Sequence, residues 1–281
     1  MPTRTRNPQG RLLLIGGHEQ REIPDAGGAL EEAPDFILRR FVDELASKNT
    51  VLVIPTASEV PEEAAQEYVD LFPKLGVEHV EVLDIQSRAQ ANHPDTLALL
   101  DRASGVMFTG GDQLRLTALL GGTQFLLRLR ERYHQEPFVI AGTSAGAAAM
   151  STAMIYQGRN NQGFRKDEIH LSAGLQLLPD TAIDTHFVTR GRIVRMAQII
   201  AANPGCLGIG LEEDTAVLVT EGREFEVLGT GIVVLVDGLN CSGNTLPLVK
   251  AGEVFSIRDL RVHLLSRGER YTMPAQMATQ Q

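Results

Sequence analysis

Short apolar runs that end abruptly in glycine, proline or small polar residues recur through the first 220 residues of this chain. Residues 12–15 lead into Gly16 and Gly17, residues 51–54 into Pro55, and residues 138–141 into Gly142. Apolar runs without alternation are typical of strands buried on both faces, as in a parallel sheet. Further candidate strands of this kind cover residues 80–83, 105–109 and 183–187.

Segments with helical periodicity separate these runs. The predicted helices cover residues 34–48, 61–75, 94–103 and 113–132, the last with a break at Gly121 and Gly122. Further helices are expected from Ala147 and from near Arg190. Strands that alternate with helices predict an α/β fold with an open, doubly wound, mainly parallel sheet. Ligands of such sheets bind beyond the carboxyl ends of the strands.

The pattern changes after residue 220. Residues 224–227, 232–236 and 260–265 are strand-like and are separated by glycine-containing turns, which predicts antiparallel strands. We find no internal repeat and no linker, so we predict one α/β domain over residues 1–281, with residues 220–270 as its antiparallel extension. The polar segment 157–168 is the best candidate for a mobile loop, and the tail after residue 273 is expected to fray.

Charge and hydropathy exclude several classes of partner. The chain has 26 Lys and Arg against 35 Asp and Glu, a net charge of −9, which repels nucleic-acid phosphates and anionic lipid. No stretch of eighteen apolar residues and no secretory signal is present. We therefore expect no nucleic-acid partner, no membrane association and a cytoplasmic location.

Two cysteines and seven histidines provide no recognisable metal-binding pattern. Cys206 and Cys241 have neither disulfide-framework nor zinc-type spacing, and no two histidines have the spacing of a helical metal site beside an acid. The glycine-rich motifs of dinucleotide and nucleotide binding are also missing. The sequence therefore predicts a metal-free and cofactor-free mechanism.

The segment Gly-Thr-Ser-Ala-Gly, centred on Ser144, is the strongest local signal for chemistry. A serine between small residues, after a buried strand and before a helix, is typical of a nucleophile elbow. The N–H of Ala145 would then face a developing oxyanion, and the glycine-rich loop at Gly111 and Asp112 would supply a second donor from Gly111 or Asp112. The structural alternative is a tight turn in which Thr143 or Ser144 caps the helix.

A serine nucleophile needs a base and an acid that orients the base. His186 is predicted at a strand end, where this fold places its active site, although a buried or helix-capping histidine is the alternative. Strand alternation over residues 207–214 predicts that Glu213 shares the apolar face and needs a partner such as an imidazole N–H. Glu212 and Asp214 would then form a solvent-facing acidic cluster.

Arg190, Arg192 and Arg195 cluster at the start of a predicted helix. A helix start is electrostatically unfavourable for cations, which favours a function such as binding a carboxylate. Solvated surface arginines are the alternative, above all for Arg192.

Several ordered motifs together resemble the serine-peptidase family that contains the cyanophycinases and the α-aspartyl dipeptidases. The resemblance covers residues 11–265 and is closer to the cyanophycinases. It rests on segments that begin at Asp84, Thr109, Ala141, Asp184 and Gly208, with Arg190 and Arg195 included. One departure is Thr185, where the cyanophycinases have glutamine, which affects one expected substrate contact.

The resemblance implies a fold like that of class I glutamine amidotransferases and a triad of Ser144, His186 and Glu213. It implies exopeptidase hydrolysis of the polymer cyanophycin to β-aspartyl-arginine by a homodimer, with the polymer bound by Gln113, Asp184, Arg190 and Arg195. An aspartyl or isoaspartyl dipeptidase that uses the same triad is one alternative. A non-catalytic, amidotransferase-like binding module is the other.

Overall fold

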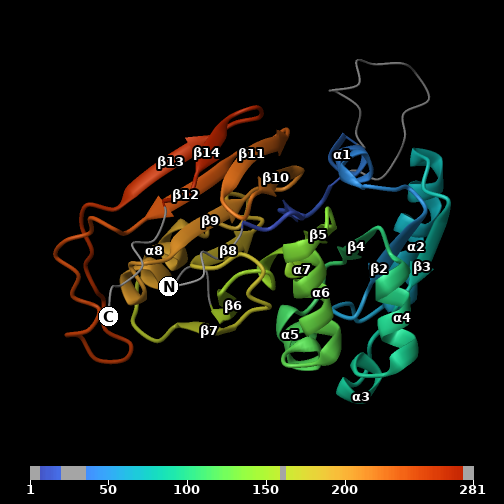
Figure 1. The fold of residues 1–281 in the computed structure, drawn as a ribbon. Coiled ribbons are helices and arrows are strands. Elements are labelled where there is room, and N and C mark those ends of the chain that lie inside the picture. Colours follow the sequence, from blue (N-terminus) through green and yellow to red (C-terminus); the bar gives the residue numbers. More distant parts are fainter. Residues whose placement is uncertain (1–6, 20–35, 159–162, 275–281) are drawn as a thin grey trace, which may run out of the picture.

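The computed structural model describes residues 7–19, 36–158 and 163–274. Its largest sheet has eight strands in the order β14-β11-β10-β1-β5-β4-β2-β3 (Figure 1). Every neighbouring pair from β1 to β3 along that order is parallel, whereas β10, β11 and β14 are antiparallel to their neighbours. The bounds of these strands are β1 Arg11–Ile15, β2 Thr50–Ile54, β3 His79–Val82, β4 Gly105–Phe108, β5 Val139–Thr143, β10 Thr215–Thr220, β11 Glu224–Gly229 and β14 Arg270–Thr272.

Both faces of the parallel strands are buried, as the apolar runs predict. In β1, Leu12 and Leu14 belong to the cluster that contains helices α4, α5 and α6, whereas Leu13 and Ile15 belong to the cluster that contains α1 and α2. All four leucine and isoleucine side chains are fully buried. The helices on the two faces are α1 Phe36–Glu44 and α2 Pro61–Leu71 on one, and α4 Pro94–Arg102, α5 Gln113–Leu120, α6 Gln124–Gln135 and α7 Ala145–Ala148 on the other.

The predicted break at Gly121 and Gly122 is confirmed. α5 ends at Leu120, and Thr123 starts α6 by accepting the N–H of Leu126 with its hydroxyl oxygen. The remaining small elements of this half are the helix α3 Arg88–Ala91 and the 3₁₀ helix η1 Phe72–Leu75. The start of the predicted helix at residue 34, part of the 157–168 segment and the tail from 275 onward lie outside the described residues.

A second sheet of four strands corrects the prediction that one sheet contains every parallel strand. β8 Thr181–Thr185 and β9 Leu207–Leu211 are parallel to each other, with α8 Ile193–Ala202 between them, but they lie in the order β13-β12-β9-β8. β12 Val233–Asp237 and β13 Arg261–Leu265 complete this sheet and are antiparallel. The physical reason is that β10 occupies the free edge of β1, so β8 and β9 cannot extend the first sheet there.

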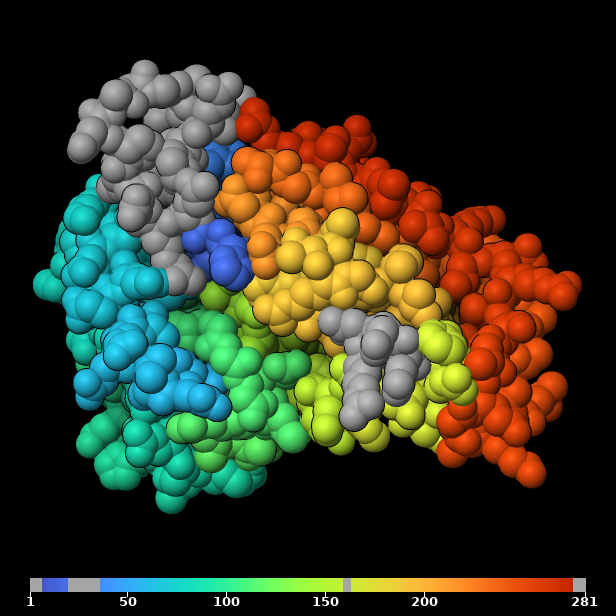
Figure 2. Space-filling view, turned by 180° about the vertical axis from the view of Figure 1, so that it is seen from behind, coloured from blue at the N-terminus to red at the C-terminus, as the bar shows by residue number. Residues whose placement is uncertain are grey.

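The two sheets share one hydrophobic core. The same apolar cluster contains Leu12 and Leu14 from the first sheet and Ile183, Ile209 and Leu235 from the second. A hairpin of β6 Ala153–Gly158 and β7 Ile169–Ala173 lies beside β8. Figure 2 shows the cyan segments at one end of the molecule and the red segments at the other, with the dark-blue start of the described chain between them, against the orange segments. In the described part of the chain, no helix has the length and apolar character that crossing a bilayer requires.

Candidate active site

Ser144 lies at the junction of β5 and α7, on the carboxyl end of the parallel sheet. β5 ends at Thr143 and α7 begins at Ala145, so the serine is the single residue between strand and helix. Its backbone has φ 50° and ψ −110°, outside the regions that L-residues normally adopt. The turn is so tight that a Cβ atom on Gly142 would lie 2.6 Å from the carbonyl carbon of Gly146.

His186 directly follows β8, and its ring lies between Ser144 and Glu213. Its Nε2 atom is 3.0 Å from Ser144 Oγ, and its Nδ1 atom is 2.6 Å from Glu213 Oε1. An ionised carboxylate only accepts hydrogen bonds, so the proton of a neutral imidazole lies on Nδ1. Nε2 is then free to accept the proton of the serine hydroxyl.

Burial has the largest influence on the charge of His186. The residue is 5% exposed, and desolvation lowers the pKa of its imidazole below the ordinary 6.5. The hydrogen bond to Glu213 raises this pKa, and the positive charges of Arg190 and Arg192 lower it. The net direction is downward, so the ring is neutral at neutral pH, which is the state that a general base requires.

Glu213 reaches His186 from a turn, which differs from the predicted strand position. β9 ends at Leu211, and the following residues form a turn in which Asp214 has φ 47°. The side chain of Glu213 is 29% exposed, so the argument from strand alternation is wrong although the residue contacts His186. The acidic run ends the strand early because it cannot continue the apolar face that Leu207, Ile209 and Leu211 form.

The end of β1 bonds to the backbone of all three of these segments. The carbonyl oxygens of Ile15, Gly16 and Gly17 accept the N–H groups of Ser144, His186 and Asp214, at 2.9, 3.1 and 2.9 Å. Gly17 has φ 106°, and a Cβ atom there would lie 2.6 Å from His186 Nε2. The chain contains other Gly-Gly pairs, and only the long-range contacts distinguish this pair from them.

Two backbone N–H groups near Ser144 are available to a ligand. Among the described residues, the N–H groups of Gly111 and Ala145 have no hydrogen-bond partner, whereas that of Asp112 donates to Ala57 O at 2.7 Å. A Cβ atom on the neighbouring Gly110 would lie 3.6 Å from Ser144 Cβ, so this loop lies beside the serine. Of the two alternatives for the second donor, the geometry favours Gly111.

Asp184 and Arg195, both predicted to bind substrate, are buried and bonded to each other. They are 2% and 6% exposed, and the guanidinium of Arg195 donates to both carboxylate oxygens of Asp184. Arg192 adds a hydrogen bond of 2.9 Å to the same carboxylate and a second one to Thr185 O. Two guanidinium groups therefore share one carboxylate, so the cluster of Asp184, Arg192 and Arg195 keeps a net positive charge near His186.

The other two predicted substrate contacts are Gln113, whose side chain is already hydrogen-bonded, and Arg190, whose side chain is exposed. The side-chain amide of Gln113 donates to Ile155 O at 2.6 Å, which connects α5 to β6. Arg190 is exposed, and its guanidinium has no partner among the residues that the structure describes. Arg190 is close enough for its charge to affect His186, and it can receive an anionic ligand.

Two further glutamates support the segments that carry Ser144 and His186, and sequence reasoning missed both contacts. Glu212 accepts the N–H groups of Val188 and Thr189, directly after His186, and these bonds lower the pKa of the carboxyl against the effect of burial. Glu19 is 4% exposed and accepts the hydroxyl of Thr143 at 2.6 Å. No local pattern signals either contact, because the partners are distant in sequence or lie in irregular turns.

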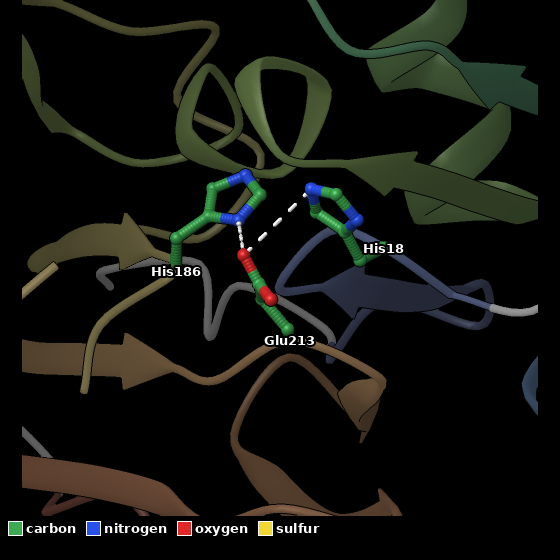
Figure 3. A group of neighbouring side chains, drawn as sticks. All are labelled: His18, His186 and Glu213. Carbon is green, nitrogen blue, oxygen red and sulfur yellow. Dashed lines mark hydrogen bonds and ion pairs between the residues drawn. The ribbon is translucent and has the colours of Figure 1, made fainter. Parts of the chain in front are cut away.

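Three side chains that could hold a metal ion lie together, although the sequence predicts no set of metal ligands. His18 lies beside His186 and Glu213, and one ligand atom from each of the three lies within 4.8 Å of the others (Figure 3). His18 is far from its two neighbours in sequence, so no spacing rule could reveal the group.

Comparison with known proteins identifies the family. Residues 12–227 match Peptidase family S51, and this range includes Ser144, His186 and Glu213. The chain belongs to this family. The predicted resemblance to a family of serine peptidases is thereby confirmed, as is the prediction of an enzyme.

The S51 peptidase chain is similar over most of its length to proteins named cyanophycinase. The protein from Synechococcus elongatus is 38% identical over 266 residues, which cover 94% of this chain and 80% of the relative. The protein from Trichormus variabilis is 38% identical over 270 residues, with 95% and 87% covered. The one from Geminocystis herdmanii is 34% identical over 261 residues and 92% of each chain.

A solved structure supports the fold of this S51 peptidase. The crystal structure of a peptidase from an acI-B1 Actinobacterium matches with a TM-score of 0.68 at 21% identity, covering 96% of this chain and 99% of the other. It supports the mixed α/β fold with a large, mostly parallel sheet and separate antiparallel strands.

Proposed function

We propose that this S51 peptidase hydrolyses cyanophycin to β-aspartyl-arginine dipeptides, with Ser144 as nucleophile, His186 as general base and Glu213 as orienting acid. The observation that carries the proposal is the continuous pair of contacts from Ser144 Oγ to His186 Nε2, 3.0 Å, and from His186 Nδ1 to Glu213 Oε1, 2.6 Å. A nucleophile bonded to a base that a carboxylate orients defines a serine-hydrolase triad by geometry. The backbone of Ser144 has the strain expected of a nucleophile elbow.

The reaction follows from the protonation states. Neutral His186 removes the proton of Ser144 as Oγ attacks the backbone carbonyl of an aspartyl residue, and Glu213 stabilises the imidazolium that forms. The N–H groups of Gly111 and Ala145 donate to the oxyanion. His186 then protonates the leaving amine, and water releases the acyl group by the same route.

The choice of cyanophycin rests on the relatives that carry the name cyanophycinase and on the groups that surround Ser144. Every branch of the polymer ends in an arginine with a carboxylate and a guanidinium. Arg190 is exposed and unpaired among the described residues, so we propose that it binds the carboxylate, as a guanidinium binds one well. Gln113 would provide its side-chain carbonyl oxygen to the guanidinium.

Asp184 and Arg195 act, in this proposal, through position. Asp184 lies on β8, two residues before His186, and Arg195 lies on α8, and because both are buried and bonded to each other they contact substrate only if their mutual bonds open. The proposal also includes a fold of the class I glutamine amidotransferase type, a single domain over residues 1–281, a homodimer and a cytoplasmic location. The two free cysteines, Cys206 and Cys241, favour a reducing compartment.

The test mixes purified protein with insoluble cyanophycin and identifies the released products by mass. We expect β-aspartyl-arginine, and a loss of activity on the order of 10⁴- to 10⁶-fold in Ser144→Ala. Ser172→Ala, on β7, is the matched control and should retain full activity. A tenth of the activity remaining in Ser144→Ala would exclude the serine mechanism.

Two further measurements distinguish the proposed function from its alternatives. Turnover of α-aspartyl or isoaspartyl dipeptides with inert cyanophycin would indicate a dipeptidase. Failure of Ser144 to react with a fluorophosphonate would indicate a non-catalytic binding module.

A further inference from the structure

His18 presents a second imidazole to the carboxylate that orients His186. Its Nε2 atom lies 3.7 Å from Glu213 Oε1, and its ring meets that of His186 edge-on, with 5.4 Å between the centroids and 82° between the planes. Figure 3 shows both imidazoles directed at the same carboxylate oxygen. The triad as proposed does not use His18, because Glu213 already accepts the Nδ1 proton of His186.

The backbone fixes where His18 lies, while its side chain remains accessible. Its own φ is 51°, and the preceding Gly17 accepts the N–H of Asp214, so the turn that carries His18 is bonded to the turn that carries Glu213. The His18 side chain is 70% exposed. An ion from solution can therefore reach the group from the side of His18.

The three ligand atoms nearly match the geometry of a zinc site. Zinc binds histidine nitrogen and carboxylate oxygen at about 2.0–2.2 Å, so tetrahedral ligands lie about 3.3–3.6 Å apart. The pair His186 Nδ1 and Glu213 Oε1 would open from 2.6 Å, the pair His18 Nε2 and Glu213 Oε1 would shorten from 3.7 Å, and all three atoms already lie within 4.8 Å. Rotation of the exposed His18 side chain can adjust the pairs that include it, whereas the pair of His186 and Glu213 opens by rotation of the Glu213 side chain, which is 29% exposed. Water can occupy the fourth position.

The donor set also suits a divalent ion in its chemistry. Two neutral imidazoles and one carboxylate are the nitrogen and oxygen ligands that Zn²⁺ prefers in open sites. The positive charges of Arg190 and Arg192 act on the same histidine and oppose a cation. We therefore expect an affinity weaker than that of a structural zinc site with four ligands.

We propose that His18, His186 and Glu213 form an inhibitory site for a divalent ion of the Zn²⁺ type. A metal needs the lone pair of His186 Nδ1, so the proton on that atom moves to Nε2. An imidazole with its proton on Nε2 cannot accept the proton of Ser144. Metal binding thereby removes the base while the fold and Ser144 stay intact, and catalysis itself needs no metal. The inhibition rests on the proposed function, whereas the binding does not.

The binding test uses isothermal titration of Zn²⁺ into the Ser144→Ala protein, which keeps all three ligands. We expect one ion per chain. His18→Asn in the same background removes one ligand, and asparagine tolerates the positive φ at this position. Loss of only a hydrogen-bond partner of a metal ligand weakens affinity by about 10- to 100-fold, so loss of the ligand should weaken it at least tenfold.

The inhibition test measures phosphonylation of Ser144 by a fluorophosphonate, with fluoride as the leaving group, at fixed Zn²⁺ concentrations. The unmodified chain should slow as zinc is added and recover with chelator, and His18→Asn should need at least about ten times more zinc for the same effect. His79→Asn, at an exposed histidine on β3, is the matched control and should behave like the unmodified chain.

Two results would overturn the proposal. One is zinc affinity and inhibition that are unchanged in His18→Asn, and the other is the lack of stoichiometric binding to the Ser144→Ala protein at millimolar zinc. Zinc binding through His18 in a chain that leaves cyanophycin intact would support the site and would remove only the proposed substrate.

Discussion

Replacement of Gly17 by alanine should impair catalysis although it changes no residue of the proposed triad. Gly17 follows β1, and its carbonyl oxygen accepts the N–H of Asp214. No side chain separates Gly17 from His186. An alanine Cβ atom there would lie 2.4 Å from His186 Cε1 and 2.6 Å from Nε2, whereas ordinary contacts of such atoms begin at 3.4 Å. The ring must therefore move by the larger difference, 3.4 − 2.4 = 1.0 Å.

The expected effect follows from this displacement. A misplacement of about 1 Å of a reacting group costs on the order of 10²-fold in rate, which is about 2.7 kcal/mol of transition-state free energy. The hydrogen bond of 3.0 Å between His186 Nε2 and Ser144 Oγ would lengthen or tilt. Because the ring belongs to the reacting groups, the loss should fall on kcat more than on KM.

The assay compares kcat and thermal stability of Gly17→Ala with those of a matched control. Gly76→Ala places alanine at a similar positive φ, 93° against 106°, where the nearest atom to its Cβ is a Lys48 side-chain carbon at 3.9 Å. Both variants should lose on the order of 1–3 kcal/mol of unfolding free energy through backbone strain, and only Gly17→Ala should lose activity. Equal activity of the two variants would refute the contact with His186 as the reason for glycine at this position.

Three further predictions concern the charges around His186. Glu213→Gln should lower kcat by about 10³- to 10⁴-fold, because the amide no longer fixes the imidazole tautomer. Glu212→Gln should lower kcat by less, because that carboxylate contacts only backbone and hydroxyl groups. The reverse order in a rate assay would contradict the assignment of Glu213. The specificity constant kcat/KM should fall as the pH drops through a midpoint below 6.5, because burial lowers the pKa of His186 and only the neutral ring is a base. A midpoint above 6.5 in the pH profile would contradict the lowered pKa of His186. Arg190→Ala should raise KM for cyanophycin and move that midpoint upward, since the positive charge that lowers the pKa is lost, and an unchanged profile together with an unchanged KM would exclude Arg190 from the site.

The order of helices and strands along the chain was predictable because local forces determine it. The apolar runs at 12–15 and 51–54 lie in β1 and β2, and the run at 138–141 begins one residue before β5. The glycine pair predicted to break the helix after Leu120 does so in the structure. Their burial on both faces follows from composition alone. Assignment of β8 and β9 to a separate sheet was not predictable, since their sequences look like those of the other parallel strands.

The site was predictable where one residue type in one context has a single chemical use, as for Ser144 after a buried strand. Glu213 was selected through strand alternation that ends at Leu211, so the reason was wrong even though the contact exists. The bonds between Asp184 and Arg195, and the approach of His18 to Glu213, depend on pairs of side chains that the tertiary fold brings together. Such pairs leave no periodic trace in the sequence.

The dependence of the site on the end of β1 has a consequence for the order of events during synthesis. β1 leaves the ribosome early, but its two neighbours, β5 and β10, end at Thr143 and Thr220. Contacts between such distant segments form slowly, and a chain emerges at roughly 5–20 residues per second. Until β10 has emerged, the growing chain therefore lacks the partners that align serine, imidazole and carboxylate, and a nascent polypeptide cannot act as a hydrolase before both neighbours of β1 are in place.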